Sequence, residues 1–535
     1  MNAEQGLLQA ILNEPEADDL RLIYADVLED SDPARSELIR LQCELASLDS
    51  DAPERAKLSV RIAELLIQHR QRWANGLNYM SHGKFKRGFL HRCCVNSVNL
   101  SSSVPHFEQT PIDECHLVCL PDQSLETILA FPHLSRLRKM HFWRLNRTED
   151  FLYDLADLPR LCDLALDQPQ FTGGEVRGLA LLFSIPSIQH LSLQLGSEIQ
   201  ERALPLPESQ THLQSLALDI SGALSLVRRL QKPLALPHLT RLNISGGICD
   251  SEWANAWQSN LRMENLVEMN LNLHSIESNY VGHLLSCVGP QLRRLTLSAW
   301  DMNRPLYGLP LSMLRKLTTL EIRGLSHDDL ARLSRLEGGS LRTLDLSNNN
   351  LTSESIQLLA DSPVLSTVHR LILKNNLIGD DGVEALARSR HLSNLRVLSL
   401  SKNRITCRGL EALAESISLS NLIKLDLAKN RIQAKGIEAL CRWPVMPRLC
   451  ILELDKNKIG DRGAIAIANG PHFQLRYLGL RENQIRQGGA SKVVGSEHHP
   501  HLMDVRLSRN GVGKELPKGG ALSHLGGDRD VWARI

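Results

Sequence analysis

Apolar residues and asparagine recur at a fixed interval in the second half of the chain. Residues 341–351 read LRTLDLSNNNL, with leucine at the first, fourth and sixth places and asparagine at the ninth. The pattern returns six times, and its asparagines are 27, 27, 27, 27, 26 and 27 residues apart. They are Asn349, Asn376, Asn403, Asn430, Asn457, Asn483 and Asn510. This spacing predicts a stack of equivalent turns over residues 341–515.

Each turn is expected to contain a short strand followed by a helix. Leu344 and Leu346 alternate with polar residues, so one face of a strand points into a core that neighbouring turns share. Where the chain bends after the strand, an asparagine amide supplies both a donor and an acceptor for unpaired backbone groups. Apolar residues at helical spacing follow in residues 379–389, 407–416 and 434–443.

The strand pattern continues upstream without the asparagine. Its apolar triples are Leu317, Leu320 and Ile322; Leu292, Leu295 and Leu297; Leu266, Met269 and Leu271; Leu239, Leu242 and Ile244; Leu213, Leu216 and Leu218; Ile188, Leu191 and Leu193; Leu161, Leu164 and Leu166; and Leu137, Met140 and Phe142. Residues 112–117 and 90–95 are two earlier candidates. We expect about fifteen turns, none of which buries its core alone.

This pattern resembles the leucine-rich-repeat consensus, and its strand-plus-helix period resembles the ribonuclease-inhibitor-like class. The resemblance implies an α/β solenoid, a horseshoe with a parallel concave sheet and convex helices. A small all-α domain is expected to precede it, because residues 1–75 show no repeat and contain apolar helical runs punctuated by Pro15, Pro33 and Pro53. Four helices are expected in this segment.

Residues 21–45 read RLIYADVLEDSDPARSELIRLQCEL and resemble the bacterial repeat-companion domain. The match departs at Val27, where that family usually has tryptophan. Trp73 and residues 84–90 resemble its trailing part. The resemblance implies a domain layout and a bacterial origin. The expected layout is a helical domain in 1–75, a connection with irregular turns in 76–130, degenerate repeats in 131–340, regular repeats in 341–515 and a tail in 516–535.

The amino-acid composition predicts a hydrophobic core and a cellular compartment. Hydrophobic residues make up 42% and charged residues 23% of the chain, so it is expected to fold around a core. The first residues carry no basic flank or uninterrupted apolar run, and no stretch of about 18 apolar residues follows. The eleven cysteines are scattered, which favours free thiols. These features predict a cytoplasmic protein that does not enter a membrane.

Motifs for catalysis are missing from the sequence, which contains no phosphate-binding glycine loop, HExxH, nucleophile elbow or paired CxxC. His498, His499 and His501 form the one candidate metal cluster, but an exposed loop is the favoured interpretation. Asp380 and Asp381 fall where a helix begins, which favours helix capping over acid–base chemistry. The sequence therefore predicts a protein that is not an enzyme and has no cofactor and no metal.

Charge is unevenly distributed along the chain. Residues 1–75 hold 8 basic and 15 acidic residues, a net charge of −7, whereas residues 341–515 hold 25 basic and 17 acidic residues, a net charge of +8. The outward strand positions and strand exits form a predicted basic stripe that Asp345, Asp426, Glu453, Asp455 and Glu482 interrupt. Its candidate partner-binding residues are Arg342, Arg370, Lys374, Arg396, Lys402, Lys424, Lys429, Lys456, Arg476, Tyr477, Arg481, Arg506 and Arg509.

A protein-interaction scaffold that binds an acidic protein partner on the concave face is the favoured function. Nucleic acid is an alternative, although the stripe has mixed signs and Tyr477 is its clearest candidate for base stacking. Self-association through the acidic helical domain and regulation of a partner enzyme are further alternatives. Trp143 and Trp300 are expected near the upstream surface or in its core. The charges of the basic stripe also have a simpler explanation, because solvent-exposed strand faces are commonly charged.

Overall fold

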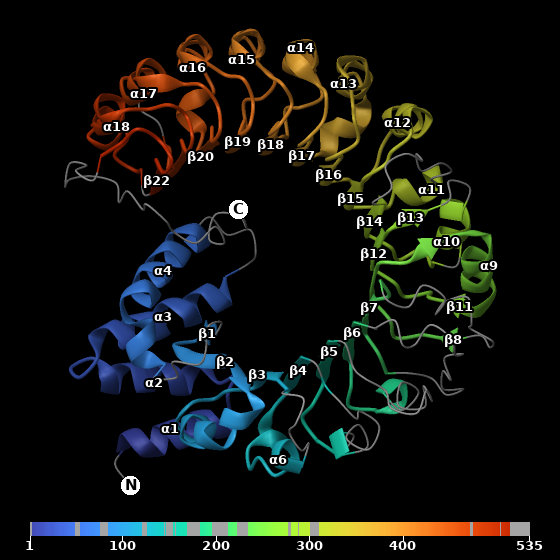
Figure 1. Ribbon diagram of the computed structural model, residues 1–535, viewed down its shortest axis with the longest axis vertical. Coiled ribbons are helices and arrows are strands. Elements are labelled where there is room, and N and C mark those ends of the chain that lie inside the picture. The colour runs from blue at the N-terminus through green and yellow to red at the C-terminus, as the bar shows by residue number, and fades with distance from the viewer. Residues whose placement is uncertain are drawn as a thin grey trace. The chain divides into compact units, whose positions relative to one another are not determined.

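The computed structural model describes residues 3–48, 54–74, 84–119, 126–143, 145, 154–155, 157–167, 182–194, 212–221, 234–276, 280–286, 288–299, 310–470, 474–502 and 504–513. They form two compact units. The N-terminal unit extends to residue 247 and includes residues 259–262, and the C-terminal unit contains residues 248–258 and continues from residue 263. Each unit contains a stack of parallel strands, which confirms the expected α/β solenoid (Figure 1).

The four helices expected in the first 75 residues are present. They are α1 (Ala3–Asn13), α2 (Asp18–Leu28), α3 (Pro33–Ser47) and α4 (Glu54–Trp73). The side chain of Asp32 caps α3 by accepting a hydrogen bond from the backbone N–H of Arg35 at 3.2 Å, and Pro33 occupies the first turn. The indole of Trp73 donates to the second carboxylate oxygen of Asp32 at 2.9 Å. One carboxylate therefore joins the start of α3 to the end of α4.

These helices share their core with the strands that follow. β1 (Lys84–Lys86) and β2 (Phe89–Asn96) form an antiparallel hairpin whose turn residues, Arg87 and Gly88, have φ of 52° and 81°. Phe89 is fully buried with Tyr24 and Ile39, and a Cβ on Gly88 would collide with Ile39. Only glycine fits this turn. The boundary expected near residue 75 thus falls inside one compact unit.

Parallel strands in the N-terminal unit occupy the positions of the degenerate apolar triples. After β2 they are β3 (Glu114–Val118), β4 (Lys139–Trp143), β5 (Asp163–Asp167), β6 (His190–Gln194), β7 (Ser215–Asp219) and β9 (Arg241–Ser245). Neighbouring strands pair residue for residue, as at Leu164, Leu191 and Leu216. The other elements are η1 (Ser97–Asn99), η2 (Ser101–Ser103), α5 (Val104–Gln109), α6 (Glu126–Leu129), η3 (Leu134–Arg136), β8 (Leu234–Ala235) and β11 (Leu261–Arg262).

The C-terminal unit continues the pattern with strands on the inner side of an arc and helices on its outer side (Figure 1). Its main strands are β12 (Glu268–Leu273), β14 (Arg294–Ala299), β15 (Thr319–Ile322), β16 (Thr343–Asp345), β17 (Arg370–Ile372), β18 (Val397–Ser399), β19 (Lys424–Asp426), β20 (Ile451–Glu453), β21 (Tyr477–Gly479) and β22 (Asp504–Arg506). A second small sheet pairs β10 (Ile248–Cys249) with β13 (Ser275–Ile276).

Helices connect these strands. They are α9 (Ser251–Asn260), α10 (Val281–Ser286), α11 (Leu311–Leu314), α12 (His327–Ser334), α13 (Ser353–Ala360), α14 (Gly379–Arg388), α15 (Cys407–Ala414), α16 (Ala434–Leu440), α17 (Gly460–Ala468) and α18 (Gln487–Val494), with 3₁₀ turns η7 (Pro363–Thr367) and η8 (Met446–Arg448). The expected helices after β17, β18 and β19 are therefore confirmed.

The regular asparagines form the predicted ladder between turns. The backbone N–H of Asn349 donates to Oδ1 of Asn376 at 2.9 Å, that of Asn376 to Asn403 at 3.1 Å, and that of Asn403 to Asn430 at 2.8 Å. Leu344, Leu371, Leu398 and Leu425 stack in register beneath it, each fully buried. The ladder and the leucine column together fix where each regular strand ends and which face it presents.

The sequence was expected to contain no membrane-spanning segment. Within the described ranges, every helix is too short or too polar to span a bilayer.

Candidate partner-binding surface

Equivalent residues of successive repeats lie side by side on the concave face, because β16 to β22 pair in register. The first outward column contains Thr343, Arg370, Val397, Lys424, Ile451, Tyr477 and Asp504, and the second contains Asp345, Ile372, Ser399, Asp426, Glu453, Gly479 and Arg506. Since side chains alternate along a strand, the leucines between these columns face the core. The repeat period thus converts distant residues into neighbours on one surface.

The exit edge of this sheet carries a row of cations in one backbone conformation. Lys402, Lys429, Lys456 and Arg509 each precede a ladder asparagine and have φ of 60°, 58°, 58° and 59°. Glu482 occupies the same place and contacts Lys456 and Arg509 at 3.1 and 3.0 Å. Among the described residues, no ion pair is found for Lys402 or Lys429. These two ammonium groups are therefore available to an external anion.

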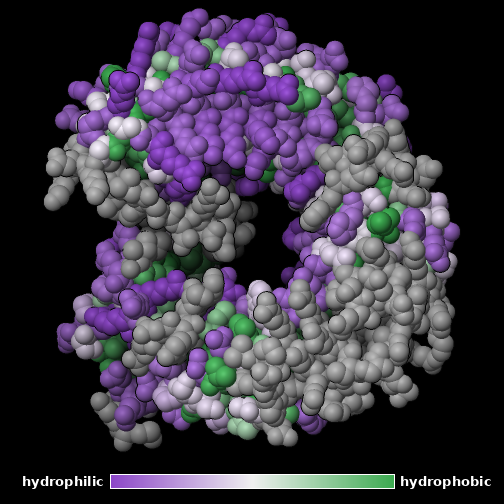
Figure 2. All heavy atoms as spheres, viewed as in Figure 1, coloured by the Kyte–Doolittle hydropathy of each residue, from purple (hydrophilic) through white to green (hydrophobic). Residues whose placement is uncertain are grey.

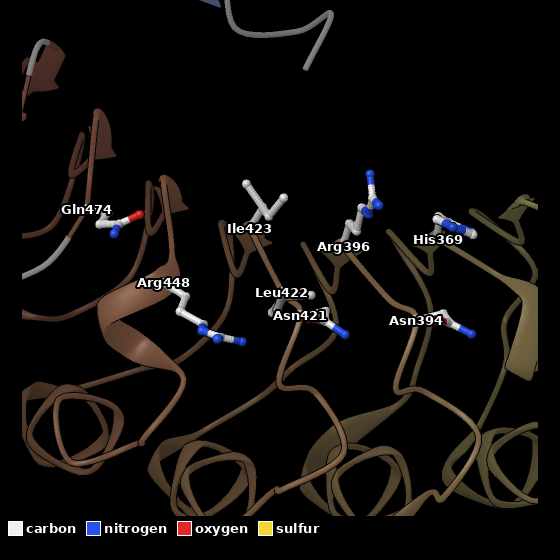
Figure 3. Close-up of a pocket in the computed structure, with 8 residues that line it drawn as sticks. All are labelled: His369, Asn394, Arg396, Asn421, Leu422, Ile423, Arg448 and Gln474. Carbon is white, nitrogen blue, oxygen red and sulfur yellow. The ribbon is translucent and has the colours of Figure 1, made fainter. Parts of the chain in front are cut away.

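The entrance edge contains a polar cavity of about 450 Å³. It is lined by His369, Asn394, Arg396, Asn421, Leu422, Ile423, Arg448 and Gln474. In Figure 3 the side chains of His369, Arg396 and Ile423 point away from the helices, while those of Asn394, Asn421 and Arg448 lie closer to them.

Backbone contacts hold the inner wall of this cavity. Asn394 and Asn421 donate side-chain N–H bonds to the carbonyls of Ser366 and Ser393 at 2.7 and 2.8 Å, and Arg448 donates to a further carbonyl at 2.9 Å. Arg396 lies on the outer wall beside Ile423, which is 37% exposed. The cavity thus presents cations and the exposed side chain of Ile423 on a fixed frame.

Acidic side chains occupy the middle of the sheet. Burial, together with the neighbouring carboxylates of Asp455 and Asp426, raises the pKa of Glu453 to about 7. Burial also raises the pKa of Asp455. On the adjacent strand, burial lowers the pKa of Lys424, and the charge of Arg370 acts in the same direction. Mixed charges in a half-buried layer therefore separate the two basic edges.

Tyr477 and Arg506 were expected on the binding surface, but both side chains are buried. Tyr477 is 1% exposed and Arg506 is 5% exposed. The Arg506 guanidinium carbon lies 4.9 Å from the centre of the Tyr477 ring, and its Nε donates to Asp504 at 3.2 Å. The pairing of β21 with β22 brings these side chains together, and their mutual packing removes them from solvent. Tyr477 is therefore not available to stack on a base.

The other predicted residues fall into three groups. Arg342, Arg396 and Arg476 lie at the entrance edge; Arg370, Lys374, Lys424 and Arg481 lie on or beside the sheet face; and Lys402, Lys429, Lys456 and Arg509 lie at the exit edge. The structure thus resolves one expected stripe into two basic edges around a sheet face of mixed charge. Figure 2 shows hydrophilic side chains over the flank formed by these repeats.

Sequence reasoning missed His369, Ile423 and Arg448 in the cavity. His369 and Ile423 occupy the same repeat position as Arg342 and Arg396, so their alignment at intervals of 27 residues was a usable signal. Arg448 lies in a 3₁₀ turn, and nothing in its spacing pointed to the cavity.

The remaining candidate residues have structural contacts. Asp380 accepts hydrogen bonds from the N–H groups of Thr406 and Gly409 at 2.8 and 3.1 Å, so it caps the helix of the next repeat. In the histidine cluster, His499 is 4% exposed, with Nε2 2.9 Å from the carbonyl oxygen of Ile467. A search of the described residues finds no metal-binding group of histidine, cysteine and acidic side chains.

Trp143 is an exposed tryptophan among the described residues of the upstream repeats. Trp143 ends β4, is 44% exposed and stacks on His141 with ring centres 4.9 Å apart. It is therefore a surface residue and not part of the core. Trp300 lies outside the described residues.

Comparison with known proteins identifies the repeat type. The Leucine Rich repeat family model matches residues 340–360, 364–387, 391–414, 418–441 and 449–468. Among solved structures, an internalin from Listeria monocytogenes is similar over 78% of this chain and 89% of its own, with 14% sequence identity and a TM-score of 0.31. No curated protein sequence matches the chain. The matched segments are leucine-rich repeats, as their asparagine spacing predicted.

Proposed function

We propose that this chain with leucine-rich repeats is a non-catalytic scaffold that binds an acidic segment of a partner protein across the concave face of residues 341–512. Repeat arrays of this type generally serve as rigid protein-binding surfaces.

The exit-edge row carries the proposal. Lys402 and Lys429 project from neighbouring turns at one backbone conformation, and no described carboxylate pairs with them. The entrance edge adds Arg396 and the cavity beside it. An acidic strand or helix that follows the sheet would meet cations at both margins, which favours fast, oriented association.

Charge reversal of the exit edge tests this proposal. The variant combines Lys402→Glu, Lys429→Glu and Lys456→Glu, and its matched control combines Lys435→Glu, Arg462→Glu and Lys492→Glu on the helices. Both triples change the net charge by the same amount. Affinity capture from native cell extract, with and without nuclease, is read by mass spectrometry and followed by binding measurements with the purified partner. We expect only the exit-edge variant to lose an acidic protein, independently of nuclease.

The exit-edge variant should keep its fold. Glu482 already occupies the equivalent place with φ of 55°, so glutamate is compatible with this backbone. Exposed charges contribute little to stability, and the melting temperature should be nearly unchanged. Unfolding of this variant would contradict the surface location of the three lysines.

Other outcomes would select the alternatives. Capture that disappears with nuclease would favour nucleic acid, although no aromatic side chain is among the exposed large apolar residues described in the C-terminal unit. Capture of a second copy would favour self-association through the acidic helices. A captured enzyme whose rate changes on binding would favour a regulatory role. Equal capture by both variants would refute the concave exit edge.

We also infer the class of the repeats, the type of the N-terminal domain and the cellular location of the protein. The strand-plus-helix repeats support the ribonuclease-inhibitor-like class, and the sequence of residues 21–45 supports a repeat-companion domain. A cytoplasmic location is supported by thiols that are packed among apolar side chains, such as Cys43, Cys93 and Cys115. Limited proteolysis would test the proposed layout of domains.

A further inference from the structure

A cysteine, a histidine and a glutamate meet on the outward face of β2 and β3 in the N-terminal unit. Cys94 and His116 are direct partners in the parallel register, and neighbouring strands lie about 4.8 Å apart. Their strand neighbours, Cys93 and Cys115, are fully buried on the opposite face with Sγ atoms 3.6 Å apart. Because side chains alternate, Cys94 and His116 share the half-exposed face.

Glu114 orients the imidazole. Nε2 of His116 lies 2.9 Å from Oε1 of Glu114, and the Cys94 thiol is a second hydrogen-bonding partner of the ring. Arg92 donates to the same Glu114 oxygen at 3.1 Å, and Nε2 of His91 lies 3.6 Å from the other oxygen. A sulfur, an imidazole and a carboxylate therefore follow one another in contact, the order in which enzymes and redox proteins activate a thiol.

The charges around this group keep His116 protonated. Burial alone would lower the pKa of His116, but its hydrogen bonds with Cys94 and Glu114 raise it to about 9. Burial would raise the pKa of Glu114, yet His116 and Arg92 lower it to about 2. On β4, burial and the charge of His116 lower the pKa of His141 to about 4, so that ring is neutral. An imidazolium thus faces Cys94 at neutral pH.

Other half-exposed thiols have a different partner. Cys162 donates to the carbonyl of Arg138 at 3.5 Å, and Cys450 donates to the carbonyl of Arg448 at 3.8 Å. A carbonyl acceptor stabilises the protonated thiol, whereas an imidazolium stabilises the thiolate. These two cysteines are therefore internal references for the reactivity of Cys94.

We propose that Cys94 is a reactive cysteine, placed beside His116, which Glu114 positions, and that it is a modification site for hydroperoxides, which it attacks as the thiolate. The sulfur attacks one peroxide oxygen, an S–O bond forms and the O–O bond breaks. The leaving hydroxide, or the alkoxide of an organic hydroperoxide, takes the proton of the His116 imidazolium and departs as water or as the alcohol. Cys94 is oxidised by two electrons to a sulfenic acid while the peroxide is reduced.

The first test measures thiolate formation in the full chain. Limiting iodoacetamide is applied between pH 5 and 10, and alkylation of each cysteine is followed by mass spectrometry. We expect Cys94 to react about tenfold faster than Cys162 and Cys450 at pH 7, with its half-maximal rate at a lower pH. Equal rates and equal pH midpoints for the three thiols would overturn the proposal without any variant.

Variants then identify the role of the neighbours. His116→Gln should move the pH midpoint of Cys94 alkylation upward, and Glu114→Gln should move it by a smaller amount because it acts through His116. His190→Gln, on β6 of the same sheet, is the matched control and should leave the profile unchanged. Circular dichroism verifies folding of each variant. A Cys94 profile that is indifferent to His116→Gln in a folded protein would contradict the assigned pair.

Hydrogen peroxide and dimedone provide the chemical readout. Dimedone traps sulfenic acid, so treatment of the wild-type chain should label Cys94 before the other cysteines, and Cys94→Ser should abolish that label. Labelling that appears first at Cys162 or Cys450 would refute the peroxide site. This result is independent of partner binding, because no step uses the C-terminal concave face.

Discussion

A single amide in each regular repeat joins two turns of the backbone. Oδ1 of Asn430 accepts hydrogen bonds from the N–H groups of Asn403 and Ile405 at 2.8 and 3.1 Å. Its Nδ2 donates to the carbonyls of Leu400 and Leu427 at 3.0 and 2.9 Å. No other small side chain offers two donors and two acceptors in a buried bend. This is the physical reason why asparagine recurs here.

Asn430→Ala should therefore lower the free energy of unfolding by about 3 kcal/mol or more, because it leaves several buried backbone groups without partners. The matched control is Asn421→Ala, since that exposed amide makes one hydrogen bond, to the carbonyl of Ser393. The control should cost below about 1 kcal/mol. Urea denaturation compares the two variants. Equal losses in the free energy of unfolding would contradict a stabilising role that is specific to the ladder asparagines.

Two glycines at helix starts separate backbone strain from packing. Gly460 begins α17 with φ of 61°, and Gly488 lies in the first turn of α18 without a positive φ; a Cβ at either would meet nothing within 4 Å. Gly460→Ala should cost about 1 to 2 kcal/mol through the left-handed conformation alone. Gly488→Ala should be neutral or stabilising by up to about 1 kcal/mol. Denaturant midpoints that shift equally would contradict this distinction.

At the scale of elements, an acid of the preceding repeat supports the starts of α15 and α18. Asp461, in the first turn of α17, accepts a hydrogen bond from the N–H of Arg486 at the start of α18 at 2.6 Å. A Cβ on Gly489 would lie 2.6 Å from the same carboxylate oxygen, so glycine permits this close approach. The acids that mark helix starts in the sequence thus cap across turns, which binds neighbouring helices together.

The buried carboxyl of Glu453 on the concave sheet makes the stability of the protein depend on pH. Burial raises the pKa of Glu453 from 4.5 to about 7. The folded protein therefore holds more protons than the unfolded chain between these values, so the free energy of unfolding should fall as pH rises from about 4.5 to 7. Glu453→Gln should remove much of this fall and stabilise the protein at pH 8 relative to wild type.

The comparison requires denaturation curves at pH 5 and pH 8. The exposed Glu497→Gln is the control and should preserve the wild-type dependence. A wild-type stability that rises from pH 5 to pH 8, with Glu453→Gln behaving identically, would contradict a buried neutral carboxyl at this position.

At the scale of the whole molecule, a repeat array transmits a defect mainly to its neighbours. Leu425→Ala empties a fully buried position in the shared core and should cost about 2 to 5 kcal/mol. Hydrogen exchange should increase in β18, β19 and β20 while α2 and α3, in the other compact unit, keep their wild-type rates. Ile417→Ala, at a residue that is 89% exposed, should change neither stability nor exchange. Uniform acceleration across both units would instead indicate one cooperative body.

The spacing of apolar residues was sufficient to locate the strands of both units, including the degenerate ones. A strand core needs only alternation and a period, and both are visible in triples such as Leu161, Leu164 and Leu166. The asparagine ladder was predictable for the same reason, because the asparagines recur at the same period as the strands. The helical segment was predictable as four helices but not as part of a shared core with Phe89.

The sequence by itself determined the repeat, the strand positions and the separation of charge between the two ends of the chain. Only the tertiary structure decided which of those charges reach solvent, because exposure depends on neighbours from other turns. The packing of Arg506 over Tyr477 buried two expected surface residues. The parallel register likewise set Cys94 beside His116, 22 positions apart in sequence, since pairing between strands is settled by the stack as a whole.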